Sequence, residues 1–140
     1  WDTAIEVRLW DRIFDNHIQT PMQQIVVDRL QQSNADLSAP RAWLQATYRV
    51  IDHQVASGSW AACGSFSLAD CAAAPALFYA SALQPFPAEL HHLAAYFERL
   101  MARPSVKRVI EGAEPYFDLF PFAAAIPAKF RKSAAARQGV

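Results

Sequence analysis

The sequence predicts an all-α protein, a bundle of five to six helices around one buried central helix. Apolar residues recur at helical spacing along most of the chain. Only four glycines occur, and there are no alternating runs rich in valine, isoleucine and threonine, as strands require. With 140 residues, 53% hydrophobic and 19% charged, the chain is long and apolar enough to bury one core.

The first predicted helix covers residues 2–32. Ile5, Leu9 and Ile13 follow helical spacing. Pro21 cannot donate a backbone hydrogen bond, and its ring crowds the preceding turn. We therefore expect a kink at residues 18–20 within this long helix.

The next two predicted helices cover residues 40–58 and 67–83. The first of them has one apolar face and should end at Gly58, a residue type common at helix C-termini. The second is apolar on every side, which is typical of a helix enclosed by others. It is therefore the predicted central helix, with Cys71 as a small core residue.

Two more helices are predicted at residues 88–102 and 104–111, the second ended by Gly112. The aromatic segment 114–122 should then fold back over the bundle. Residues 1–122 make one predicted domain. Residues 123–140 carry four basic and no acidic side chains and are predicted to be a frayed tail.

The start of the predicted central helix carries a capping box. The Ser67 hydroxyl can accept the N–H of Asp70, and the Asp70 carboxylate can accept the N–H of Ser67. Phe66 and Cys71 occupy the flanking staple positions. Loss of Asp70 should cost about 1–2 kcal/mol of stability.

The order of these motifs resembles the C-terminal domain of bacterial-type glutathione S-transferases. In that family a Ser/Thr-x-x-Asp box opens the central helix, and an Arg-Pro-Ser/Ala step precedes a late helix. The matching segments are Phe66-Ser67-Leu68-Ala69-Asp70-Cys71, Pro75, Arg103-Pro104-Ser105-Val106, residues 10–17 with 20–22, and residues 114–117 with 120–121. The resemblance covers residues 1–122.

The resemblance implies a transferase that conjugates glutathione to hydrophobic electrophiles, a detoxification activity. Family members activate the glutathione thiol in an N-terminal thioredoxin-like domain, which also holds most of the glutathione. This sequence contains no such region, so we assign no catalytic residue to it and expect the chain alone to be inactive. Glutathione is the implied co-substrate, and no other cofactor is implied. The resemblance further implies a cytoplasmic homodimer with the first two helices at the interface.

In the family, the helical domain contributes the electrophile pocket from its first helix and its C-terminal segment. The resemblance therefore implies six residues that line the cleft: Trp10, Ile13, Asn16, His17, Thr20 and Phe117. The competing interpretation is that Trp10 and Ile13 are ordinary core residues and that His17 is a satisfied core or interface histidine.

Other functions have less support in the sequence. No basic patch interleaved with aromatic residues points to nucleic acid. The apolar run 71–83 is about 13 residues, whereas a membrane helix needs ~20. His91 and His92 are adjacent on a helix and cannot chelate a metal together. The two cysteines form no metal-binding pattern, so a reducing compartment is expected.

Two alternative interpretations remain. One is a transferase-like fold used only as an interaction module, and the other is an unrelated helical bundle. The chain opens at Trp1 without an initiator methionine, which suggests a domain of a longer protein.

Overall fold

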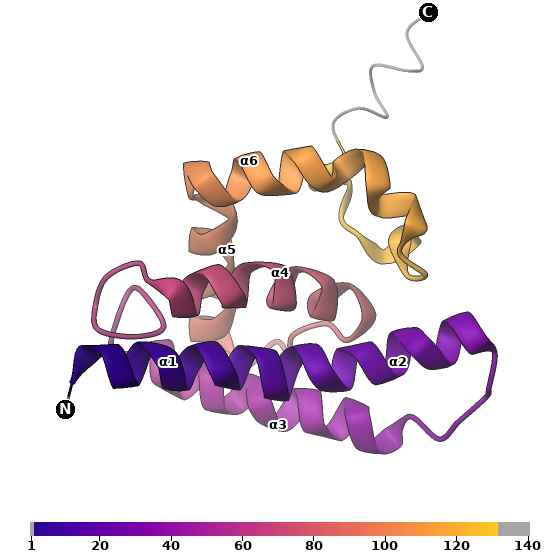
Figure 1. Ribbon diagram of the computed structural model, residues 1–140, viewed down its shortest axis with the longest axis horizontal. Helices are drawn as coiled ribbons and strands as arrows, with labels where there is room; N and C mark the ends of the chain where they lie inside the picture. Colours follow the sequence, from indigo (N-terminus) through magenta and orange to yellow (C-terminus); the bar gives the residue numbers. More distant parts are fainter. Residues whose placement is uncertain (1, 132–140) are drawn as a thin grey trace, which may run out of the picture.

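The computed structural model describes residues 2–131, which form only helices and the loops between them. Figure 1 shows a long N-terminal rod, a second helix antiparallel to it, and the later helices on its other side. The helices are α1 (Thr3–Phe14), α2 (Thr20–Gln31), α3 (Ser38–Val55), α4 (Leu68–Leu83), α5 (His91–Ala102) and α6 (Pro104–Ala113). Short helical turns are η1 (Asp15–Gln19), η2 (Glu114–Leu119), η3 (Ala123–Ala125) and η4 (Ala128–Phe130). The predicted all-α fold class is confirmed.

The kink predicted at residues 18–20 is wrong: a π-helical turn lies there, and α1 and α2 run nearly in one line. Residues Asp15–Gln19 form η1, and the Thr20 N–H donates to the carbonyl of Asp15, five residues back. The π-helical turn ends two residues before Pro21. In a regular α-helix the proline ring would clash with the carbonyl four residues earlier, and the wider turn relieves this clash. In Figure 1, α1 and α2 consequently run on nearly in one line.

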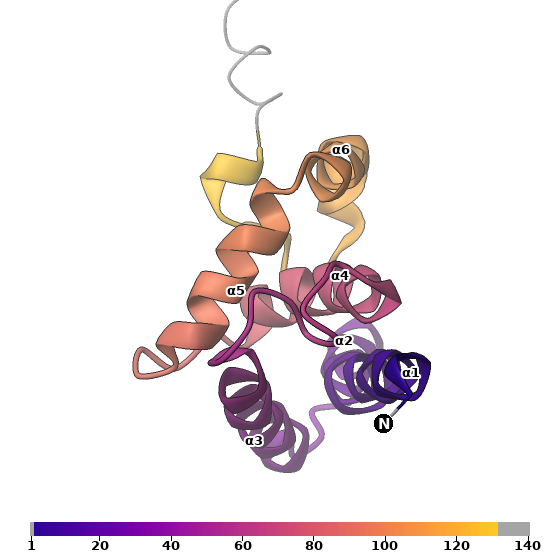
Figure 2. The same ribbon diagram turned by 90° about the vertical axis from the view of Figure 1, so that its left-hand side faces the viewer.

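Helix α4 is the central helix, as the sequence predicts. It contacts α1, η1, α2, α5 and η3, and Figure 2 shows it between the N-terminal rod on one side and α5 and α6 on the other. Small alanines on its buried face, among them Ala69, Ala73 and Ala80, allow neighbouring backbones to approach closely. One strip of α4 remains uncovered, and Cys71 lies in it, so the expectation that Cys71 is a core residue is wrong.

The predicted capping box forms, and its carboxylate has more partners than the sequence indicates. Asp70 is fully buried and accepts hydrogen bonds from the Ser67 N–H at 2.9 Å and the Ser67 hydroxyl at 3.2 Å. It also accepts the Ala61 N–H at 3.0 Å and the Tyr96 hydroxyl at 2.7 Å. The box therefore joins the loop before α4, α4 itself and α5.

Two buried tyrosines join helices through their hydroxyls. Tyr48 of α3 donates to the carbonyl of Gln84 at 3.0 Å, and Tyr96 of α5 donates to Asp70. Burial raises the pKa of both phenols, and for Tyr96 the negative charge of Asp70 raises it further. Both phenols are thus neutral hydrogen-bond donors throughout the physiological pH range.

The loop before α4 is held in place by contacts between an arginine and two aromatic rings. The Arg103 guanidinium lies 3.6 Å from the centroid of the Phe66 ring and 5.9 Å from that of Trp60. The two rings meet edge to face at 5.2 Å. Since Arg103 precedes α6, these contacts fix the start of α6 against the loop that carries the capping box.

Several predicted ends of helices are wrong. Helix α3 ends at Val55 rather than at Gly58, and α6 continues through Gly112 into η2. Helix α5 begins at His91, three residues later than predicted, because the Asp52 carboxylate of α3 accepts the Leu93 N–H at 2.8 Å and caps that end.

Residues 123–131 pack on the bundle, contrary to the expectation that the chain is frayed from residue 123. Ile126 is buried in the core, and the Phe130 ring packs on Phe78 of α4 at 5.1 Å. Arg131 donates to the Asp118 carboxylate at 3.2 Å and to the Ala123 carbonyl at 2.6 Å. The rest of the expected tail, 132–140, lies outside the described residues.

The contacts of Asp70 predict how much the Tyr96 hydroxyl contributes to the stability of the fold. Tyr96→Phe removes one hydrogen bond to a buried carboxylate and should lower the free energy of unfolding by about 1.5–3 kcal/mol. Tyr116→Phe is the matched control, because Tyr116 is 67% exposed and should change stability by less than ~0.5 kcal/mol. Urea denaturation followed by circular dichroism measures both, and equal effects would show that the Tyr96 bond contributes nothing specific.

Candidate functional site

Two of the six predicted cleft residues lie in the interior. Trp10 is buried and packs on Phe14, with ring centroids 6.1 Å apart. Phe117 is buried against Phe78 at 5.5 Å. Ile13 is half-buried at the edge of the same core.

The polar residues of the set lie at the surface around the π-helical turn. Asn16, His17 and Thr20 are exposed, and the Thr20 hydroxyl donates to the Asp15 carbonyl at 3.3 Å. The Nδ1 atom of His17 accepts the indole N–H of Trp43 at 3.1 Å, and the two rings meet edge to face. His17 thus contacts α3.

A groove of about 430 Å³ lies between the N-terminal rod and α4; we call it the α1–α4 groove. One wall is polar and the other is formed by small apolar side chains. Its lining residues are Asp11, Arg12, Asp15, Gln19, Ala72, Pro75 and Ala76. Arg12 pairs with Asp11 and Asp15, each at 2.9 Å, and these carboxylates raise the pKa of its guanidinium. These three side chains together carry one net negative charge at the polar edge of the groove.

An uncovered apolar strip runs along α4 beside this groove; we call it the α4 strip. It consists of Leu68, which is 58% exposed, together with Cys71 and Pro75. Pro75 has no N–H, so the carbonyl of Cys71 lacks its usual helical donor on this face. The strip could not be predicted from the sequence, because a helix that is apolar all round has no preferred face.

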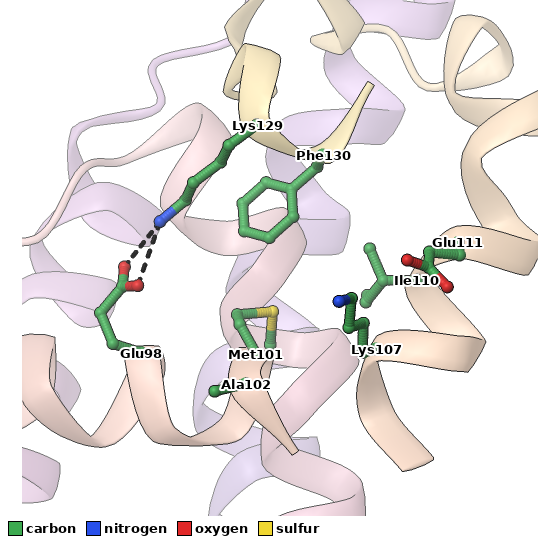
Figure 3. A pocket seen from close by; sticks show the side chains of 8 residues that line it. All are labelled: Glu98, Met101, Ala102, Lys107, Ile110, Glu111, Lys129 and Phe130. Carbon is green, nitrogen blue, oxygen red and sulfur yellow. Dashed lines mark hydrogen bonds and ion pairs between the residues drawn. The ribbon is translucent and has the colours of Figure 1, made fainter. Parts of the chain in front are cut away.

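Two further grooves lie elsewhere on the bundle. One, of about 600 Å³, runs between α2 and the start of α3 and is lined mainly by polar side chains, including Thr20, Gln23, Gln24 and Gln31. The other, of about 340 Å³, lies between α5, α6 and η4 (Figure 3). Of the six predicted cleft residues, Thr20 alone lines any of these three grooves.

The part of the chain that the structure describes holds no group of three or more histidine, cysteine, aspartate or glutamate side chains placed to bind a metal ion. None of its helices has the length and apolarity needed to cross a bilayer.

Comparison with protein families finds a match to the glutathione S-transferase C-terminal domain over residues 13–104, about two thirds of the chain. No match is found among curated proteins or among solved structures. The matched range includes the π-helical turn, α3, the capping box, all of α4 and all of α5. The chain belongs to the glutathione S-transferase C-terminal domain family.

Proposed function

We propose that this chain is the electrophile-site and dimer-contact domain of a glutathione transferase that conjugates glutathione thiolate to hydrophobic electrophiles. The α4 strip carries this proposal. The thiolate would be generated in a thioredoxin-like domain, which would also hold most of the glutathione. We place the enzyme in the reducing cytoplasm, in keeping with the free thiols of Cys63 and Cys71.

The α4 strip supports a second domain seated on this face. Contiguous exposed apolar surface on a central helix is a common sign of an interface. The strip is continuous with the α1–α4 groove, since Pro75 belongs to both. A domain seated there would close a cleft with charged and amide groups on one wall and methyl groups on the other. Such a cleft suits a polar tripeptide beside an apolar electrophile.

Our proposal for the substrate-binding residues of this domain remains the six residues Trp10, Ile13, Asn16, His17, Thr20 and Phe117, none of which lines the α1–α4 groove. Exposure of Asn16, His17 and Thr20 leaves their polar atoms accessible to a substrate or to a second domain. Burial of Trp10 and Phe117 gives them a supporting role, in which they hold the cleft wall from within.

The function is tested by comparing this chain with the full-length protein. The 140-residue chain should show no conjugation of glutathione to a chromogenic aryl halide above the uncatalysed rate, because our proposal assigns the thiol-activating group to the other domain. The full-length protein should conjugate. Activity of the chain alone would overturn the assignment of chemistry to the other domain, and an inactive full-length protein that still binds glutathione would overturn the enzyme assignment.

The cleft residues are tested in the full-length enzyme. Asn16→Ala and His17→Ala should each raise the Michaelis constant of glutathione or of the electrophile by about five- to tenfold, because each removes a polar contact to a bound substrate. Steady-state kinetics with both substrates measures the effect. Trp43→Phe is the matched control, since it removes the donor of the His17–Trp43 hydrogen bond and leaves the His17 side chain in place. If Trp43→Phe changes the constants as much as His17→Ala does, His17 acts by positioning the helix.

The proposed dimer contact rests on an exposed stripe of α3. Trp43 is 38% exposed and Val50 is 54% exposed, and they lie seven residues apart with the exposed Ala46 between them. These positions share one face of the helix. The same stripe also favours the second candidate, a non-catalytic interaction module, because a bundle face of this kind can bind an unrelated protein.

A charge placed in the stripe should separate subunits. Val50→Glu should weaken self-association of the full-length protein at least tenfold, because it buries a carboxylate without a partner. Sedimentation equilibrium measures the dissociation constant. Val109→Glu makes the same change at a valine of α6 that is 68% exposed, and it should leave association unchanged. A protein that is monomeric before the change would exclude the dimer and favour the interaction module.

A further inference from the structure

The groove between α5, α6 and η4, which we call the α5–α6 groove, has an apolar floor built from three segments. Met101 comes from α5, Ile110 from α6 and Phe130 from η4 (Figure 3). Met101 and Ile110 are buried, whereas Phe130 is partly exposed, and its other side packs on Phe78. The volume of about 340 Å³ lies in the range of small-molecule sites.

The rim of this groove is charged, and one of its cations forms no ion pair with any carboxylate of the described residues. The Lys129 ammonium donates to both carboxylate oxygens of Glu98, at 2.8 and 3.1 Å, so these two charges neutralise one another. Glu111 also lines the groove and has an interaction of its own. Within residues 2–131, no carboxylate lies at ion-pair distance from Lys107. Figure 3 shows its ammonium directed towards the space between Met101 and Ile110.

We propose that the α5–α6 groove binds a small aromatic monocarboxylate. Its ring would lie between the Met101 thioether and the Phe130 ring, and its carboxylate would accept a hydrogen bond from Lys107. A polarisable sulfur and a ring edge both favour an aromatic ligand over an aliphatic one. The Lys107 ammonium, which pairs with no carboxylate of residues 2–131, lies beside apolar side chains and favours one negative charge on an otherwise apolar molecule.

This site is separate from the cleft proposed for conjugation. No residue that lines it lines the α1–α4 groove or belongs to the α4 strip. All of its lining residues lie in this chain, so binding requires neither a second domain nor glutathione. The inference therefore stands whether or not the conjugation proposal holds.

The two methionines make the test specific. Protein labelled with ¹³C at the methionine methyl groups reports Met101 in the groove floor and Met22 in α2, which does not line the groove. During titration of the 140-residue chain with 2-naphthoate, the Met101 methyl resonance should shift and saturate, while that of Met22 should not move. A shift of both methyl groups, or no saturable shift of Met101, would overturn the proposal.

Variants test the role of charge. Lys107→Gln should weaken 2-naphthoate binding about tenfold, since it replaces a charge-assisted hydrogen bond with a neutral one. Arg108→Gln is the matched control, because Arg108 is the exposed neighbour on α6 that does not line the groove. The neutral analogue 2-naphthylmethanol should bind the unmodified chain about tenfold more weakly than the carboxylate. Equal losses in the two variants, or equal binding of the two ligands, would remove Lys107 from the site.

A bulky substitution in the groove tests whether the ligand binds there. Ala102 lines the groove and is exposed, so Ala102→Phe should occupy the space without opening a cavity elsewhere and should abolish the Met101 response. Ala95→Phe makes the same change at an exposed position of α5 that does not line the groove, and it should leave binding intact. Circular dichroism confirms that each variant is folded. Retained binding in Ala102→Phe would place the ligand elsewhere.

Discussion

One buried carboxylate organises the bundle. Asp70 lies at the start of α4, where four donors surround it: two from Ser67, one from the Ala61 backbone and one from Tyr96. Among the described residues no cation pairs with it, so hydrogen bonds and the N-terminal end of the α4 dipole compensate for its lost hydration. Because the donors come from the loop before α4 and from α5, one carboxylate of α4 fixes the positions of both helices.

The orientation of α4 follows from this constraint and decides which surface is left open. With its start fixed, the alanine face turns inward and Leu68, Cys71 and Pro75 turn outward. The α4 strip is therefore a consequence of how the helix is anchored, and the family relationship gives a reason for a second domain to cover it.

The helices and the capping box could be predicted because their causes are local. Apolar spacing defines α1 to α5, and the Ser67–Asp70 pair depends on residues three apart. Tyr96 and Asp52 were missed as partners because the contacts of Asp70 with Tyr96 and of Asp52 with Leu93 join residues 26 and 41 positions apart. Gly58 and Gly112 were read as helix ends, yet neither adopts a positive φ angle, and Gly112 lies within α6.

The candidate site was less predictable. The spacing of residues in the sequence shows which face of a helix they share, but it does not show which other helix packs against that face. His17 is exposed, and the indole N–H of Trp43 on α3 donates to it. Phe117 follows a proline in an aromatic segment, and the nearby Phe78 ring accounts for its burial. Both outcomes depend on how distant helices pack.

The two proposed binding surfaces differ in how much of each this chain supplies. The α1–α4 groove borders an uncovered apolar strip, so its chemistry depends on what is seated there. The α5–α6 groove has a floor and a charged rim from three segments of one chain, with Phe130 fixed between the groove and α4. A ligand bound there would bridge α5, α6 and η4, and it would stabilise the fold in proportion to its concentration relative to its dissociation constant. Since η4 closes this groove, the segment expected to be frayed becomes the part of the fold on which recognition there depends.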